Sequence, residues 1–138
     1  MTAVSFTVTK IVPLEPSAVI AGIAGEAMTP GVVCQKNTSE VWVKADASTQ
    51  EGCTGLLGLV IAGGKRHSAG TIASGEKISL VVFGRVAGFA SLSEAVDYYL
   101  SDTAGVIADA KGTCFRFLGH AEGEEVFFFN PVGVPTSA

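Results

Sequence analysis

A glycine-rich segment followed by two basic residues is the first place in this sequence where chemistry could reside. Four residues separate Gly58 from Gly63, and Lys65 and Arg66 follow Gly64. A phosphate-binding loop needs a lysine directly after the second glycine, and then a serine or threonine hydroxyl that binds magnesium. Because Gly64 intervenes and Arg66 replaces the hydroxyl, we interpret the segment as a glycine hairpin with an exposed basic tip.

The histidines and cysteines are too few and too scattered to form a metal site or a catalytic set. The histidines are His67 and His120, and the cysteines are Cys34, Cys53 and Cys114. None of them has the spacing of zinc ligands. We therefore expect no enzymatic activity, no cofactor and no metal. An odd number of widely spaced cysteines predicts three reduced, buried thiols in a protein made in a cytoplasm.

The composition predicts a protein that assembles with other chains. Only 16% of the 138 residues are charged and 48% are hydrophobic, whereas soluble domains have roughly 25% charged residues. The net charge of −4 leaves no basic surface for nucleic acid. The uncharged stretch 52–64 is shorter than the roughly 20 residues of a membrane helix, so neither nucleic acid nor a membrane is an expected partner. Surplus apolar surface with few charges is typical of a chain that hides part of its surface against a partner.

Short strand patterns bounded by turn residues recur along the chain. Residues 4–12 alternate apolar and polar side chains, and Pro13 and Pro16 are expected to stop regular pairing. Seven further strands are predicted at residues 31–35, 41–45, 56–62, 77–87, 97–100, 114–119 and 125–130. Such short strands separated by Gly, Asn and Asp predict an all-β fold, a small β-sandwich or barrel.

Two parts of the chain repeat the same order of features. Met28 aligns with Leu92 and Asn37 with Asp102, and each part continues with Ala-Asp-Ala, an apolar run and a Gly-Glu pair before a strand. The repeat predicts a single domain with a degenerate duplicated β unit. Its expected parts are an N-terminal strand or arm (1–25), a first unit (26–90), a second unit (91–130) and an irregular tail (131–138).

Residues 91–100 also match a helix, because Ser91 and Glu94 form a capping box. The repeat favours a turn followed by a strand instead. The corresponding part of the first unit contains Pro30 and Gly31, which do not suit the interior of a helix.

Three segments carry bulky apolar side chains that could contact a partner. Side chains in 126–129 alternate between the two faces of a sheet, so both faces need cover. Either the protein core covers both faces, or a subunit interface covers one of them. Tyr98 and Tyr99 raise the same question. The N-terminal segment is either an extended arm that adds a strand to a neighbour or a first strand in the chain's own sheet. The predicted partner-contact residues are Phe6, Val8, Ile11, Tyr98, Phe127 and Phe129.

Four segments carry a resemblance to a known family. They read GEAMTPGVV at 25–33, KADA at 44–47, LGLVI at 57–61 and YLSDTAG at 99–105. This pattern, within residues 19–130, resembles small virion proteins of tailed bacteriophages, the capsid decoration or cement proteins. The resemblance implies a non-enzymatic homo-oligomer of two or three copies that binds the major capsid protein on the outside of the shell and stabilises it. It would be made in the host cytoplasm and then reside on the virion. The alternative is a tail, neck or fibre component with a stacking or host-surface role.

Overall fold

The computed structural model describes residues 5–6, 11–37, 39–49, 56–63, 72–90, 92–93, 96–131 and 136–137. Within these residues the chain contains strands and no helix, which confirms the predicted all-β class. The strands are β1 (Ser5–Phe6), β2 (Val12–Ile23), β3 (Val33–Lys36), β4 (Trp42–Lys44), β5 (Leu57–Gly63), β6 (Lys77–Ala87), β7 (Phe89–Ala90), β8 (Asp97–Leu100), β9 (Ile107–Ala108), β10 (Cys114–Phe115), β11 (Phe117–Ala121), β12 (Val126–Phe129) and β13 (Thr136–Ser137).

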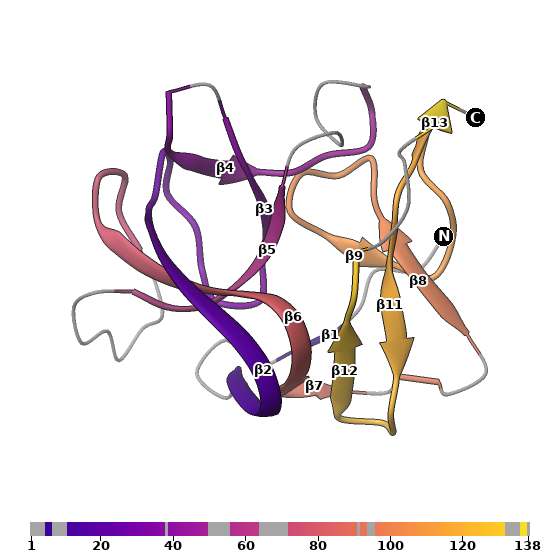
Figure 1. Cartoon of the computed structure of the whole chain (residues 1–138). Helices are drawn as coiled ribbons and strands as arrows, with labels where there is room; N and C mark the ends of the chain where they lie inside the picture. The colour runs from indigo at the N-terminus through magenta and orange to yellow at the C-terminus, as the bar shows by residue number, and fades with distance from the viewer. Residues whose placement is uncertain are drawn as a thin grey trace.

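The main sheet is antiparallel and curls into a half-barrel around the long strand β6. Its path runs β4-β3-β5-β6-β12-β11-β8-β9, and β2 pairs with β6 off this path. β5 pairs with residues 78–81 of β6 and β12 with residues 84–87, so β6 joins the two halves of the sheet (Figure 1). At Gly84, where φ is +128°, a Cβ atom would overlap the backbone of Ser17, so this glycine allows the close approach of β2.

β6 contributes side chains to two hydrophobic clusters. Ile78 and Leu80 belong to a smaller cluster around Trp42, whereas Val81 and Val86 belong to the larger one. The register shifts opposite Val81 and Phe83, and such a bulge changes which side chains of a strand face inward. One strand can therefore cover both cores.

Several predicted strands are confirmed, two of them with their bounds. Residues 77–87 form β6 and residues 97–100 form β8. The helix alternative is therefore wrong at 97–100. The predicted strand 114–119 is interrupted at Arg116, which separates β10 from β11. The tail is less irregular than expected, because Thr136–Ser137 pairs with β10.

The N-terminal segment belongs to the chain's own sheet. β2 continues through Pro13 and Pro16 and pairs with β6 from Val12 to Ile23, and β1 pairs with β7. The prediction of an extended arm is wrong for these residues, and the alternative of a strand in the chain's own sheet is confirmed. Proline is tolerated here because β2 lies at a sheet edge, where only one side of the strand must supply ladder hydrogen bonds. Residues 1–4 and 7–10 lie outside the described part of the chain.

The strand order is the same when the main path is followed from either end. β4-β3-β5-β6 in the first half corresponds to β9-β8-β11-β12 in the second, with the same antiparallel neighbours. A duplicated unit would produce this arrangement. The duplication and the boundaries at residues 26, 91 and 131 stay predictions.

Candidate interaction surface

Most of the predicted contact residues lie in the chain's own core. Phe127 packs with its ring centroid 5.6 Å from that of Phe89 and 5.8 Å from that of Tyr98. The four buried residues of the predicted set are Ile11, Tyr98, Phe127 and Phe129. Their assignment to a partner surface is therefore wrong for the folded chain, because this face of the strands is covered by the chain itself. The side chain of Phe6 and the whole of Val8 lie outside the described residues.

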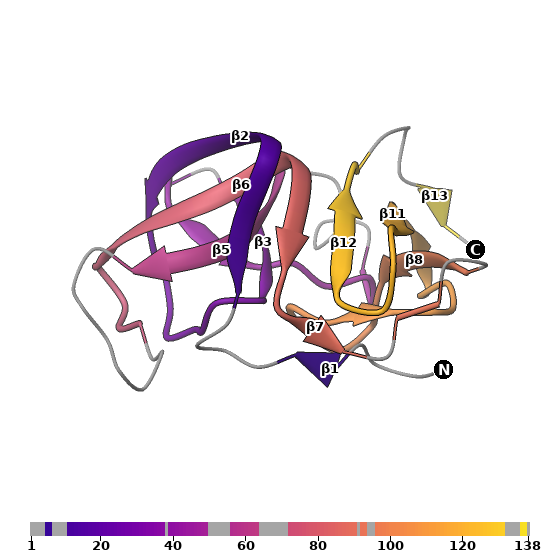
Figure 2. The ribbon, with the colours of Figure 1, turned by 90° about the horizontal axis from the view of Figure 1, so that it is seen from below.

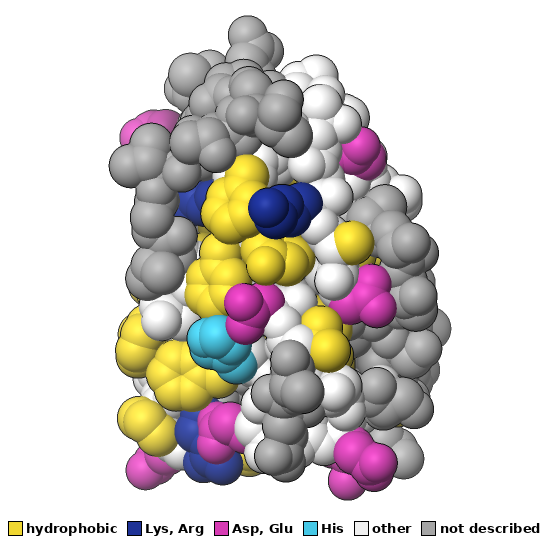
Figure 3. Space-filling view, turned by 90° about the vertical axis from the view of Figure 1, so that its right-hand side faces the viewer, with side chains coloured by type: hydrophobic (Ala, Val, Ile, Leu, Met, Phe, Trp, Pro, Cys, Tyr) yellow, Lys and Arg dark blue, Asp and Glu magenta, His cyan; other side chains and the backbone are white. Residues whose placement is uncertain are grey.

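The opposite face of the same strands carries aromatic rings that the chain leaves half-buried or exposed. Successive side chains of a strand point to opposite faces, so the residues between the core positions point outward. We call this set the aromatic face: Phe83 on β6, Phe128 on β12, Phe117 and His120 on β11, Tyr99 on β8 and Phe115 on β10. Figure 3 shows apolar side chains gathered in a column on this side of the molecule, with a histidine and acidic groups beside them.

The rings of the aromatic face form a nearly continuous series across neighbouring strands. The centroid of Tyr99 lies 5.4 Å from that of Phe115 and 6.1 Å from that of Phe117. The rings of Phe117 and His120 are 5.0 Å apart. His120 is the cross-strand partner of Phe128. These spacings are typical of tilted and edge-to-face aromatic pairs, which hold each other in place.

The series ends on β6. Phe83 lies edge-to-face with Phe128 at 5.3 Å and is 45% exposed. The aromatic face therefore crosses five strands: β6, β12, β11 and β8 belong to the main sheet, and β10 pairs separately with β13. A rigid backbone beneath the rings means that a partner would meet a preformed surface.

Several charged groups on and beside the aromatic face contact one another or a ring. The Nδ1 atom of His120 lies 2.9 Å from Oδ1 of Asp97, and the ammonium of Lys111 lies 5.3 Å from the ring centroid of Phe115. The Nε atom of Arg85 donates to the carboxylate of Glu122 at 2.8 and 3.0 Å. Asp97 and Glu122 thus lie beside a histidine and an arginine respectively.

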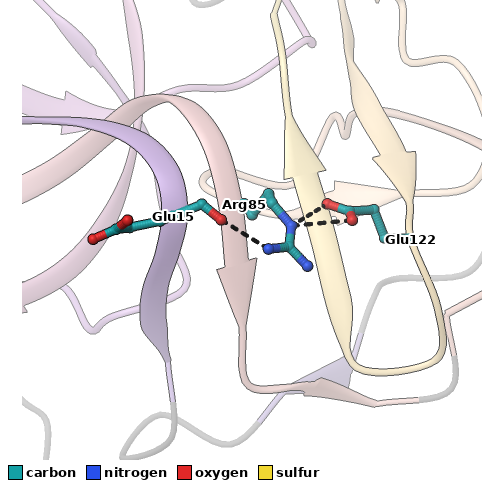
Figure 4. Close-up of polar contacts among 3 residues, drawn as sticks. All are labelled: Glu15, Arg85 and Glu122. Carbon is teal, nitrogen blue, oxygen red and sulfur yellow. Dashed lines mark hydrogen bonds and ion pairs between the residues drawn. The ribbon is translucent and has the colours of Figure 1, made fainter.

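Arg85 also connects separate elements. Besides its ion pair with Glu122, which follows β11, its Nη1 atom donates to the carbonyl oxygen of Glu15 on β2 at 2.8 Å (Figure 4). One side chain thus links β2, β6 and the β11–β12 turn. The sequence offers no signal for this link, because Glu15 and Glu122 are far apart along the chain.

Tyr98 shows how a buried polar group is satisfied beneath the aromatic face. Its hydroxyl accepts a hydrogen bond from the backbone N–H of Ser93 at 2.9 Å. Buried Arg116 lies between β10 and β11, and burial lowers the pKa of its guanidinium. Tyr98 is 5% exposed and Arg116 8%, so we assign both of them a structural role.

The cysteines differ from the prediction of three reduced thiols. Cys34 is free and buried, with its Sγ atom 3.6 Å from Sδ of Met28. Cys114 is disulfide-bonded, so the prediction is wrong for this residue. Cys53 lies outside the described residues. The cysteines therefore no longer support the inference that the protein is made in a reducing compartment.

The segment that resembles a phosphate-binding loop starts as a strand. Gly58 and Gly63 both belong to β5, and residues 64–66 lie outside the described part. Within the described ranges, no three His, Cys, Asp or Glu side chains gather closely enough to hold a metal ion. The same ranges contain no helix with the length and apolar character needed to cross a bilayer. Comparison of the chain with protein-family models, curated proteins and solved structures finds no match.

Proposed function

We propose that this chain is a non-enzymatic virion structural protein that binds the major capsid protein on the outside of a tailed-bacteriophage shell and stabilises the shell. The observation that carries the proposal is the aromatic face on β6, β8, β10, β11 and β12. The sequence resemblance to capsid decoration proteins supplies the identity of the partner.

The chemistry of the aromatic face suits a protein partner. Aromatic residues are enriched in the buried centres of protein interfaces, where charged residues are depleted. Here the rings of Phe117, Tyr99 and Phe128 lie in the middle, and the Arg85–Glu122 ion pair lies at one end. A partner that covers such rings removes apolar surface from water. Each Å² of apolar surface removed stabilises the complex by about 25 cal/mol.

A decoration protein stabilises a shell because its binding is thermodynamically linked to shell assembly. Because it binds the assembled shell and not the separated subunits, its binding shifts the equilibrium toward the assembled state. The function requires an exposed, rigid contact surface and no reacting groups. The paired strands under the aromatic face meet that requirement.

Co-sedimentation with mature, undecorated capsids of the parent phage tests the proposal. We expect the wild-type chain to pellet with capsids, and the double variant Phe117→Ser, Phe128→Ser to lose at least ten-fold in affinity. Leu56→Ser is the matched control, because Leu56 is 56% exposed but precedes β5, outside the aromatic face. Circular dichroism confirms that each variant is folded.

Two results would overturn the proposal. The first is a wild-type chain that stays in the supernatant with undecorated capsids. The second is immunogold labelling of parent virions that marks the tail and leaves the head bare, which would support the tail, neck or fibre role instead.

A further inference from the structure

The aromatic face contains a group that changes its charge near neutral pH. His120 lies on β11, and an imidazole gains or loses its proton between pH 5 and 8. Figure 3 shows the histidine within the column of apolar side chains, with an acidic group beside it. Its ring centroid lies 5.0 Å from that of Phe117. A partner that covers the aromatic face therefore also covers this imidazole.

The register places His120 in one cross-strand row of the main sheet. Figure 2 shows β12 and β11 side by side between β6 and β8. His120 is the cross-strand partner of Asp97 on β8 and of Phe128 on β12. Phe128 is in turn the partner of Arg85 on β6. Directly opposite side chains lie on the same face of a sheet, so the row presents a carboxylate, an imidazole, a ring and a guanidinium to the same side.

The imidazole is placed to neutralise the carboxylate of Asp97. The Nδ1 atom of His120 lies 2.9 Å from Oδ1 of Asp97. In the free chain the two side chains are 58% and 52% exposed, so water solvates both of them. An exposed pair contributes little to stability, whereas a charge that is buried without its partner is strongly destabilising. The charge of the imidazole therefore matters little to the free chain and becomes important when a partner covers the pair.

Other charged groups near this row, among the described residues, have partners of their own or lie in a turn. Arg85 on β6 donates to the carboxylate of Glu122, which follows β11, at 2.8 and 3.0 Å. The ammonium of Lys111 lies over a ring at the other end of the aromatic face. Glu124 and Glu125 are exposed in the turn between β11 and β12. The neutralisation of Asp97 thus depends on the imidazole beside it.

We propose that protonation of His120 switches the aromatic face to its tighter-binding form, so that the chain binds its partner more tightly at pH 5.5 than at pH 8. This inference rests on the proposed function, because it needs a partner that covers the aromatic face. With an imidazolium, the covered pair is neutral as a whole. With a neutral imidazole, the partner must bury the carboxylate of Asp97 without an opposite charge, which weakens binding. Because linkage is reciprocal, partner binding also favours the protonated imidazole.

Co-sedimentation with undecorated capsids of the parent phage at pH 5.5, 6.5 and 8.0 tests the switch. We expect wild-type binding to be at least about five-fold tighter at pH 5.5 than at pH 8.0, within the limit of about ten-fold per pH unit that one linked proton allows. His120→Gln carries no charge at any of these pH values and should lose this dependence. The ratio of the wild-type affinity to the His120→Gln affinity, measured on the same capsids, removes any titration of the capsid itself.

Asp97→Asn gives a second readout, because it should reverse the sign of the effect. Without the carboxylate, an imidazolium under the partner is itself the uncompensated charge. Relative to His120→Gln, this variant should therefore bind more tightly at pH 8.0 than at pH 5.5. Glu40→Gln is the matched control, since Glu40 is an exposed carboxylate before β4, outside the aromatic face, and it should keep the wild-type dependence. Circular dichroism at each pH confirms that the variants are folded.

The outcomes separate this switch from the proposed function. If the wild-type chain and His120→Gln have the same pH profile, or if Asp97→Asn keeps the wild-type sign, the switch is wrong while capsid binding stands. A wild-type chain that binds capsids at none of the three pH values overturns the proposed function, and the switch with it.

Discussion

The thiol of Cys34 is buried in the cluster around Trp42 and has little chance to ionise. Burial raises its pKa to about 12, the negative charge of Glu26 adds to the rise, and Lys44 opposes it. The thiolate is the reactive form of cysteine. Cys34 is therefore a packing residue rather than a nucleophile.

This raised pKa predicts a loss of stability at alkaline pH. In the unfolded chain the thiol ionises near its ordinary pKa of 9.0, whereas in the folded chain it keeps its proton up to about pH 12. Between these values the folded state binds more protons, so the free energy of unfolding falls as pH rises. The contribution of this one group is about 1.4 kcal/mol per pH unit, and it is fully present below pH 9.

Urea unfolding between pH 8 and pH 11 measures this effect. The comparison is wild type against Cys34→Ala, in which all other groups still titrate. The wild-type chain should lose stability more steeply than the variant above pH 9. Parallel curves for the two proteins would contradict the assignment.

At the scale of elements, β11 and β12 approach each other closely at Gly119. A Cβ atom there would overlap the carbonyl oxygen of Phe128, and φ is +152°. We expect Gly119→Ala to destabilise the fold by about 1–3 kcal/mol or more, because the backbone must move and a strained φ must be kept.

Gly123, in the turn between the same two strands, is the control. A Cβ atom there meets nothing within 4 Å, so Gly123→Ala should change the stability by no more than about 0.5 kcal/mol. Chemical denaturation of the two variants gives the comparison. Equal destabilisation would show that loss of a glycine, rather than the close approach of the strands, is responsible.

The elements also show how far the sequence predicts this fold. The alternation of 77–87 and the turn before 97–100 predict β6 and β8 with their bounds. The pairing of β2 beyond Pro13 escapes prediction because Pro13 and Pro16 normally end a strand. Only the position of β2 at a sheet edge makes these prolines acceptable, and edge position depends on pairing with β6, which is distant in sequence.

At the scale of the whole molecule, the two cysteines in the described part of the chain differ in state. Cys34 is free and Cys114 is disulfide-bonded, and a disulfide uses two of the three cysteines. Alkylation of the denatured, unreduced monomer should therefore add one label by intact mass, and alkylation after reduction should add three. Three labels without reduction would contradict the disulfide. Purification with and without an alkylating agent in the lysis buffer controls for oxidation during handling.

The candidate surface shows the limit of sequence reasoning most clearly. The sequence identifies 126–129 and Tyr98–Tyr99 as bulky segments that need cover on both faces. It does not say which face the chain covers itself. The prediction chose Tyr98, Phe127 and Phe129 as contacts, whereas the core takes these residues and leaves Tyr99 and Phe128 toward the outside.

The sequence by itself determined the all-β class and the position of many strands, because period-two alternation and turn residues are local properties. Two features were decided only by the tertiary structure: which face of each strand is buried, and that β2, among the described strands, lies at an edge of the sheet. Alternation divides a strand into two faces that are equivalent until distant segments pack on one of them. The curl of the sheet around β6 made that choice and left the aromatic face outside.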